Sequence, residues 1–257
     1  MRYGLDISPA GEWGRPDQIA ELAALAEDHG WDGVFCEDYL AFPGGLATYD
    51  VWVTLGLVAQ ATTRLTLGTM VTPVPRRHLE TLALQTISVD HVSGGRLVLG
   101  VGIGDPEGDA VVGDQGRPAG ELLDEALDRL VGLWSGTRLQ PPPVQVPRIP
   151  IWVGGAITKA GPRARALRWD GACLYRVPPP DWEDLTPDDV ARLRADAGHP
   201  SYVVAVGGRE RRDDPVAERR YVASLADAGA DWWHEYVPPR LSWPEARRRI
   251  QAGPVRA

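Results

Sequence analysis

The sequence predicts one α/β domain, residues 1–257, built as a closed (β/α)8 barrel, the TIM-barrel architecture. Two observations favour this fold. Strand-like segments begin near residues 2, 33, 65, 97, 149, 171, 202 and 231, and helical patterns lie between them. All but one of the steps are 22–32 residues, close to the size of one strand–helix unit. The count and the spacing favour a barrel over the runner-up, an open doubly wound sheet.

The clearest strand–helix–strand unit lies between Arg64 and Gly104. The continuously apolar run 65–74 predicts a strand buried on both faces. A helix expected over 78–92 carries its apolar residues on one side and ends in Ser-Gly-Gly, where glycine suits a left-handed cap. The next strand ends in alternate glycines at 100, 102 and 104. Such a strand lets a flat or bulky group approach the backbone closely.

Helical periodicity predicts the other helices. The expected ranges are 18–29, 51–61, 121–134, 187–197, 215–228 and 244–250, and a further helix begins near Lys159. Asp50 and Thr186 are suitable N-caps for two of them. The proline-rich segment 141–147 is interpreted as an extended connection rather than a domain boundary.

Composition limits the function. The chain has 257 residues, a net charge of −8 and 44% hydrophobic residues. An acidic chain argues against nucleic acid and anionic membrane partners. Cys36 and Cys173 lie in apolar runs, which indicates buried reduced thiols, and no Cys/His spacing indicates a metal site. Without a signal peptide or an apolar run of about 20 residues, we expect a cytoplasmic protein. The arginines between 209 and 220 alternate with acidic residues and are expected to be solvated.

In a barrel, the reactive side chains gather at the carboxyl ends of the strands. Glu37 and Asp38 end the second strand, where adjacent residues face opposite ways, so they are not expected to pair; either could also be a surface carboxylate or a helix cap. His78 and His234 are the histidines that could reach the barrel mouth, although a structural role fits each as well. Gly154-Gly155 precedes a helix start and suits either a phosphate or an ordinary tight turn.

Seven segments, in order along the chain, carry a resemblance to a known family. They are WDGVFCEDYL (31–40), LTLGTMVTPVPRRH (65–78), DHVSGGRLVLGVGIG (90–104), LWSG (133–136), IPIWVGG (149–155), RWDGA (168–172) and DAGADWWHE (227–235). Together they resemble the bacterial-luciferase-like family of flavin- and deazaflavin-dependent oxidoreductases. The resemblance implies a (β/α)8 barrel that holds FMN, or the deazaflavin coenzyme F420, in its mouth. It implies either oxygen-dependent monooxygenation or hydride transfer on a small organic substrate.

The resemblance also implies roles for particular residues. A bulge in the third strand, often with a cis peptide, would back the ring of the cofactor. Tyr39 stands where relatives often carry histidine, and its neutral hydroxyl would be a donor rather than a base. Tyr39 and His78 are the candidate catalytic residues. The candidate cofactor-binding residues are Asp38, Thr69, Met70, Val71, Gly102, Gly104, Gly154, Gly155 and Thr158, of which Thr158 could instead cap the following helix.

Three departures from the family pattern bear on the site. The segment 137–148 and the loop after Gly104 are short, which implies a more open or differently covered pocket. The usual Gly-Thr-Pro-Glu turn after the seventh strand is replaced by 208–215, where Arg209 could serve as the charge partner of a phosphate.

The leading hypothesis is an oxidoreductase that uses FMN or F420, with a separate flavin reductase as a partner if the cofactor is FMN. One alternative is a non-catalytic barrel that binds flavin or another ligand. An aldolase-like barrel ranks last, because the only lysine, Lys159, lies past a glycine turn rather than at a strand end. Apolar residues in excess of one core face, in particular Leu123, Leu127, Leu130, Leu133 and Trp134, favour a homodimer.

Overall fold

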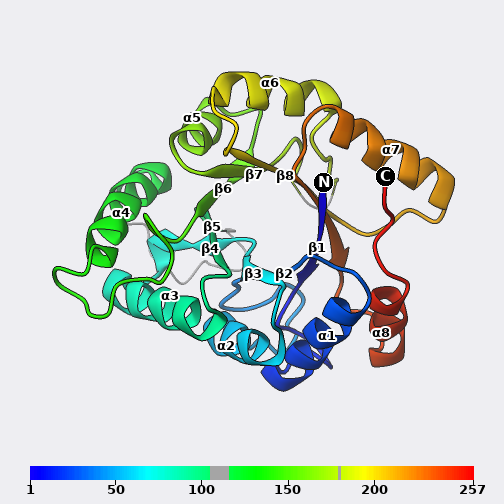
Figure 1. The fold of residues 1–257 in the computed structure, drawn as a ribbon, viewed down its shortest axis with the longest axis horizontal. Helices are drawn as coiled ribbons and strands as arrows, with labels where there is room; N and C mark the ends of the chain where they lie inside the picture. The colour runs from blue at the N-terminus through cyan, green and yellow to red at the C-terminus, as the bar shows by residue number, and fades with distance from the viewer. Residues whose placement is uncertain (105–115, 179–180) are drawn as a thin grey trace.

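Parallel strands form a closed ring surrounded by helices in the computed structural model, which describes residues 1–104, 116–178 and 181–257 (Figure 1). The strands are β1 (Arg2–Ile7), β2 (Gly33–Cys36), β3 (Thr66–Thr69), β4 (Thr72–Pro73), β5 (Leu97–Gly102), β6 (Ile151–Ala156), β7 (Gly171–Tyr175), β8 (Val203–Arg209) and β9 (Trp232–Val237). The helices are α1 (Pro16–Asp28), α2 (Val51–Ala61), α3 (Leu79–Ser93), α4 (Ala119–Trp134), α5 (Ala160–Arg168), α6 (Pro187–Ala197), α7 (Pro215–Asp227) and α8 (Trp243–Gln251), with a short 3-10 helix η1 (Val74–Arg76).

The ring closes because the first and last strands, β1 and β9, pair with each other, and because β3 pairs with β5. β1 pairs with β2 and with β9, and β3 pairs with β5 through Leu67 opposite Leu97. The strand order is β3-β2-β1-β9-β8-β7-β6-β5-β4, and β3 and β4 together fill one place in the barrel. The predicted (β/α)8 barrel is confirmed.

The third strand is not continuous: the apolar pattern alone predicted one run over 65–74, which is wrong, whereas the bulge with a cis peptide that the family resemblance implied is present. β3 ends at Thr69, the Met70–Val71 peptide is cis, and β4 resumes at Thr72 opposite Val101 of β5. The break coincides with Gly100, where a Cβ atom would collide with the carbonyl oxygen of Thr69. The apolar pattern hides this break because a bulge keeps its flanking residues buried.

The helix boundaries follow their caps. Asp50 accepts hydrogen bonds of 2.9 Å from the amides of Trp52 and Val53, and Thr186 forms a capping box with Asp189. Gly94 closes α3 at φ 66°, as the sequence predicted. Thr158 does not cap α5: the N-cap position is Lys159, which makes no side-chain cap.

The core has two compartments, and β9 contributes to both. Trp232 points into the barrel against Phe35 and Trp152, whereas Trp233 points outward and meets Tyr221 of α7 edge to face. The five apolar residues of α4 that suggested a dimer are all buried in the outer compartment, so that argument for a dimer is wrong. Across the described ranges, no helix is both long and apolar enough to cross a membrane.

Candidate active site at the carboxyl end of the barrel

Three neighbouring strands bring Ser8, Glu37 and Tyr236 together at the carboxyl end of the barrel. Ser8 follows β1, Glu37 follows β2, and Tyr236 lies near the end of β9. Ser8 Oγ donates a short hydrogen bond to Glu37 Oε2, and the Tyr236 hydroxyl lies 3.0 Å from Ser8 Oγ and 3.5 Å from Glu37 Oε2. Burial and the nearby Asp6 carboxylate raise the pKa of Glu37 to about 7, although the Ser8 and Tyr236 hydroxyls oppose the rise. Sequence analysis did not select Glu37 as a site residue.

One layer deeper in the barrel, Asp6 pairs with His234. Their Oδ1 and Nδ1 atoms are 2.8 Å apart, and both side chains are buried. The His234 ring packs on Phe35 at a centroid distance of 4.7 Å, and in the part of the chain that the structure describes its Nε2 atom has no hydrogen-bond partner. His234 therefore lies inside the barrel rather than on its rim. It binds Asp6, the carboxylate whose charge raises the pKa of Glu37.

Asp38 faces away from Glu37, as the alternation along a strand predicts. Arg76 Nη2 donates to the carbonyl oxygen of Asp38 at 2.7 Å and to its Oδ1 at 2.8 Å, and Arg77 binds the same carboxylate. Burial raises the pKa of Asp38, while the charge of Arg77 opposes that rise. The carboxylate therefore holds two arginines at the rim of the barrel.

The two candidate catalytic residues have different settings. Tyr39 is partly buried, and its ring meets that of Phe42 edge to face at 5.0 Å. His78 is the N-cap residue of α3 and its side chain is 76% exposed, with Nδ1 3.2 Å from the hydroxyl of Thr81 and 3.7 Å from Glu80 Oε2. The structure thus places Tyr39 beside the acidic pair of β2 and leaves His78 on a helix terminus in contact with its own helix.

Several predicted cofactor-binding residues meet around Val71. A Cβ atom on Gly102 would lie 2.7 Å from Val71 Cγ2, and one on Gly154 would lie 2.9 Å from Val71 Cγ1. The glycines of β5 and β6 therefore accept the Val71 side chain of the bulge, a neighbour within the protein that sequence analysis did not foresee. The Thr69 hydroxyl is engaged as well, because it donates to the carbonyl oxygen of Gly100 at 2.8 Å.

The end of β6 offers the best fit for a phosphate. Gly155 has φ 141°, and its Cα faces Pro162 so closely that an added Cβ would lie 2.9 Å from the proline Cβ. The nine-residue helix α5 starts just beyond, with no side-chain cap on its first amides and with the cation of Lys159 at the N-cap. Free amides and a positive helix end favour an anion. Gly104 has φ 92°, and the loop after it, predicted to be short, lies outside the described residues.

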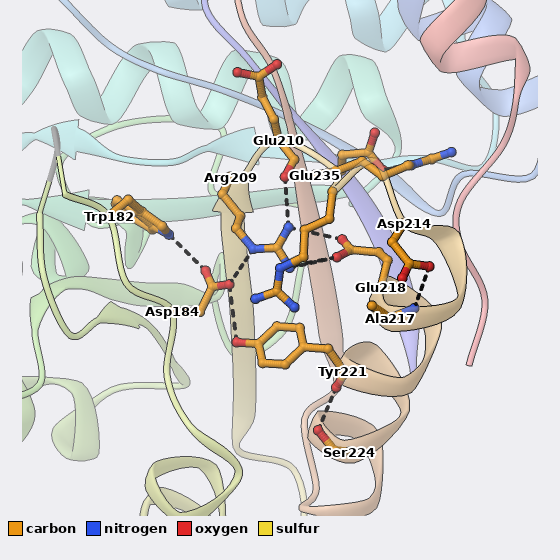
Figure 2. Close-up of polar contacts among 12 residues, drawn as sticks. Trp182, Asp184, Arg209, Glu210, Asp214, Ala217, Glu218, Tyr221, Ser224 and Glu235 are labelled. Atoms are coloured by element: carbon orange, nitrogen blue, oxygen red, sulfur yellow. Dashed lines mark hydrogen bonds and ion pairs between the residues drawn. The ribbon is translucent and has the colours of Figure 1, made fainter.

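The end of β8 does not fit a phosphate (Figure 2). Arg209 binds Asp184 at 2.9 Å and Glu218 at 2.9 and 3.1 Å, and Arg211 binds Glu235 at 2.8 Å. The Arg209 side chain is only 16% exposed and that of Glu218 is 1% exposed, so the prediction of a solvated arginine cluster is wrong for these residues. The charge of Arg209 is already balanced by two carboxylates, which removes it as a phosphate partner.

The same ion pairs position an aromatic side chain that sequence analysis missed. Asp184 Oδ1 accepts a hydrogen bond of 2.8 Å from the indole of Trp182 (Figure 2). The Trp182 ring also packs on that of Tyr175 at a centroid distance of 5.1 Å. A Cβ on Gly208 would lie 3.1 Å from Trp182 Cζ2 and 3.5 Å from Asp6 Oδ2. Trp182 therefore stands at the ends of β7 and β8, close to Asp6.

Comparison with known proteins agrees with this barrel. The family model described as luciferase-like monooxygenase matches residues 4–251. The chain belongs to this family. The sequence-based recognition of the family is confirmed.

The names of similar proteins describe different reactions. An F420-dependent glucose-6-phosphate dehydrogenase from Nakamurella multipartita is 35% identical over 147 residues, which cover 54% of this chain and 42% of that protein. A 4-hydroxyprotoasukamycin monooxygenase from Streptomyces nodosus subsp. asukaensis is 26% identical over 287 residues, covering 97% of this chain and 76% of that protein. The chain thus spans less than half the length of the F420-dependent relative.

Solved structures share the fold at low sequence identity. An F420-dependent secondary alcohol dehydrogenase, in complex with an F420-acetone adduct, superposes with a TM-score of 0.75 and 14% identity over 100% of this chain and 99% of that one. At that identity the likeness bears on the fold alone.

Proposed function

We propose that this protein is an oxidoreductase that binds FMN or F420 in the mouth of its barrel and acts on a small organic substrate. The observation that carries the proposal is the set of groups at the strand ends of a family-type barrel. An uncapped helix start suits a phosphate, a glycine-backed bulge offers a wall for a flat ring, and a polar cluster lies across the mouth. The bound cofactor would supply the two-electron redox chemistry.

The residues would divide the work of holding the cofactor. Gly154, Gly155 and the start of α5 would receive its phosphate, and Met70 and Val71 would back the ring. Asp38 would contribute to cofactor binding indirectly, because it fixes Arg76 and Arg77 at the rim of the barrel. The substrate would lie above the ring, within reach of Tyr39.

The choice between FMN and F420 can be tested directly. Apoprotein is titrated separately with FMN and with F420, and the fluorescence of each coenzyme is followed. We expect saturable one-to-one binding of one of them, and Gly155→Leu should weaken it at least about tenfold (~1.4 kcal/mol), because the side chain would collide with Pro162 and distort the turn that precedes α5. A bound, reduced FMN that is reoxidised with O2 uptake indicates a monooxygenase served by a separate reductase. Bound F420 indicates hydride transfer. Binding of neither coenzyme would overturn the proposal.

We also propose a homodimer, formed through α2 and α3 rather than through α4. These two helices lie side by side (Figure 1). Four of their large apolar side chains are exposed: Val53, Leu57, Leu84 and Val92. Val53, Leu84 and Val92 line a groove of about 370 Å³ between the helices, together with Trp52, Gly56 and Val89 among others. A second copy, related by a two-fold axis, would place the exposed apolar side chains of one protomer in the groove of its partner.

A further inference from the structure

The cluster of Ser8, Glu37 and Tyr236 has an open side. Both hydroxyls approach the same carboxylate oxygen, Glu37 Oε2. Within the described chain, no residue forms a hydrogen bond with the other oxygen, Oε1, and the Glu37 side chain is partly exposed. The carboxyl group is therefore fixed from one side and available from the other, at the end of the barrel where a substrate would enter.

No residue that the structure describes forms an ion pair with Glu37. Asp6 on β1 and Tyr236 on β9 are the titratable groups that face it from the adjacent strands, and Cys36 precedes it on β2. Arg76 and Arg77 bind the carboxylate of the next residue, Asp38, and His234 is paired with Asp6. A partly buried carboxyl without a cationic partner is suited to exchanging a proton, whereas one locked in an ion pair is not.

We propose that Glu37 is the acid–base residue of this site and exchanges a proton with the substrate through Oε1, while Ser8 and Tyr236 position it. The proposal rests on the proposed function. When a substrate hydroxyl is oxidised, its O–H bond breaks and the proton forms an O–H bond with Glu37 Oε1. The hydrogen of the adjacent C–H bond leaves with its two electrons, as a hydride, to the flavin or deazaflavin. The proton then passes to water. Reduction reverses each transfer.

The first test measures the proton on the apoprotein. The glutamate carboxyl carbons are labelled with 13C, and their chemical shifts are followed from pH 4 to 9. We expect one resonance with a midpoint near the value of about 7 to which the pKa of Glu37 is raised, and this resonance should be missing in Glu37→Gln but present in the exposed control Glu12→Gln. Ser8→Ala should move the midpoint upward, because a donor to the carboxylate is lost. Asp6→Asn should move it downward, because a neighbouring negative charge is lost.

The second test links that proton to the cofactor site, with FMN and F420 themselves as probes. Saturation with the coenzyme that binds should displace the Glu37 midpoint, and Glu37→Gln should change the coenzyme Kd less than about threefold. Two results would overturn the role of Glu37 and leave the proposed function intact. One is a resonance with a midpoint near neutral pH that persists in Glu37→Gln. The other is a Glu37 midpoint that coenzyme binding leaves unchanged. Absence of binding by either coenzyme in the wild-type protein would overturn the proposed function and, with it, this role.

Discussion

Glu37 and Asp38 are adjacent, chemically alike, and placed in opposite environments. Asp38 is bound by two arginines, which offset the cost of its burial. Glu37 is held by two neutral hydroxyls beside a further carboxylate, so its burial is not offset by a positive charge. One carboxylate is therefore a structural anion and the other a proton-exchanging group, and the difference depends on which way each points at the end of β2.

This environment makes stability depend on pH in a defined direction. Because the folded state raises the pKa of Glu37 from 4.5 to about 7, the folded protein binds this proton more tightly than the unfolded chain. The resulting stabilisation is fully present below the unfolded pKa and is lost as the pH rises through the folded pKa. We expect the free energy of unfolding of the wild type, relative to that of Glu37→Gln, to fall between pH 4.5 and about 7 and then to level off. Denaturation series at several pH values measure this difference, and a flat difference would contradict it.

Gly102 shows why one glycine of β5 has to be a glycine. Gly102→Ala would place a methyl group 2.7 Å from Val71 Cγ2, and such overpacking lowers the free energy of unfolding by about 1–3 kcal/mol. Val71→Ala should relieve the clash, so the double variant should lose less than the two single variants combined. Gly132→Ala on α4 is the control, since nothing lies within 4 Å of the added methyl. Strict additivity in urea denaturation would rule out the contact as the cause.

Tyr39 carries the hydroxyl nearest in sequence to the acidic pair of β2. Tyr39→Phe keeps the ring and its contact with Phe42 and removes the oxygen only. If the hydroxyl donates to the reacting substrate, turnover should fall by roughly 10²-fold with little change in coenzyme affinity. Single-turnover kinetics with a substrate that the enzyme converts measure the effect, and an unaltered rate would leave Tyr39 as a wall of the pocket.

At the scale of elements, the end of β8 is fixed to α7 by charge. Glu218→Gln leaves the buried Arg209 with one carboxylate instead of two, and we expect a loss of about 3 kcal/mol in the free energy of unfolding. Glu210→Gln is the matched control, because its partner Arg240 is 63% exposed and such pairs contribute about 0–1 kcal/mol. Equal losses in the two variants, measured by chemical denaturation, would mean that burial does not decide the strength of this pair.

The sequence determines elements more readily than it determines the site. Caps such as Asp50, Thr186 and Gly94 act over three or four residues, so the helices they bound are predictable. The break between β3 and β4 is hidden in the apolar pattern, which a bulge preserves, and only the resemblance to the family implied a bulge with a cis peptide there. The cluster around Glu37 joins residues 29 to 228 positions apart, and only the closure of the barrel brings them together. Alternation along β2 predicted that the side chains of Glu37 and Asp38 would point in opposite directions, but not which residues each would contact.

At the scale of the whole molecule, the face of a helix on which an apolar residue lies decides whether it packs in the core or is available to a second copy of the chain. The barrel helices cover the strands with one face, and four of the five leucines of α4 are buried there: Leu123, Leu127, Leu130 and Leu133. On α2 and α3, by contrast, apolar residues remain on the outer face, where the helices lie side by side (Figure 1). A monomer leaves this patch in water, whereas a two-fold pairing would cover it on both copies at once.

Leu84 provides the test of that pairing, because it is 48% exposed on α3 and lines the groove between α2 and α3. We expect the wild-type protein to scatter light as a particle of about twice 27.9 kDa and Leu84→Glu to scatter as a monomer. The cause would be that a charge buried in an apolar interface costs more than the contact contributes. Val216→Glu is the control: Val216 is 63% exposed on α7, away from the patch, so this variant should keep the mass of the wild type. Circular dichroism checks that both variants remain folded. A monomer mass for the wild type at every concentration, or a dimer that survives Leu84→Glu, would contradict an interface at α2 and α3.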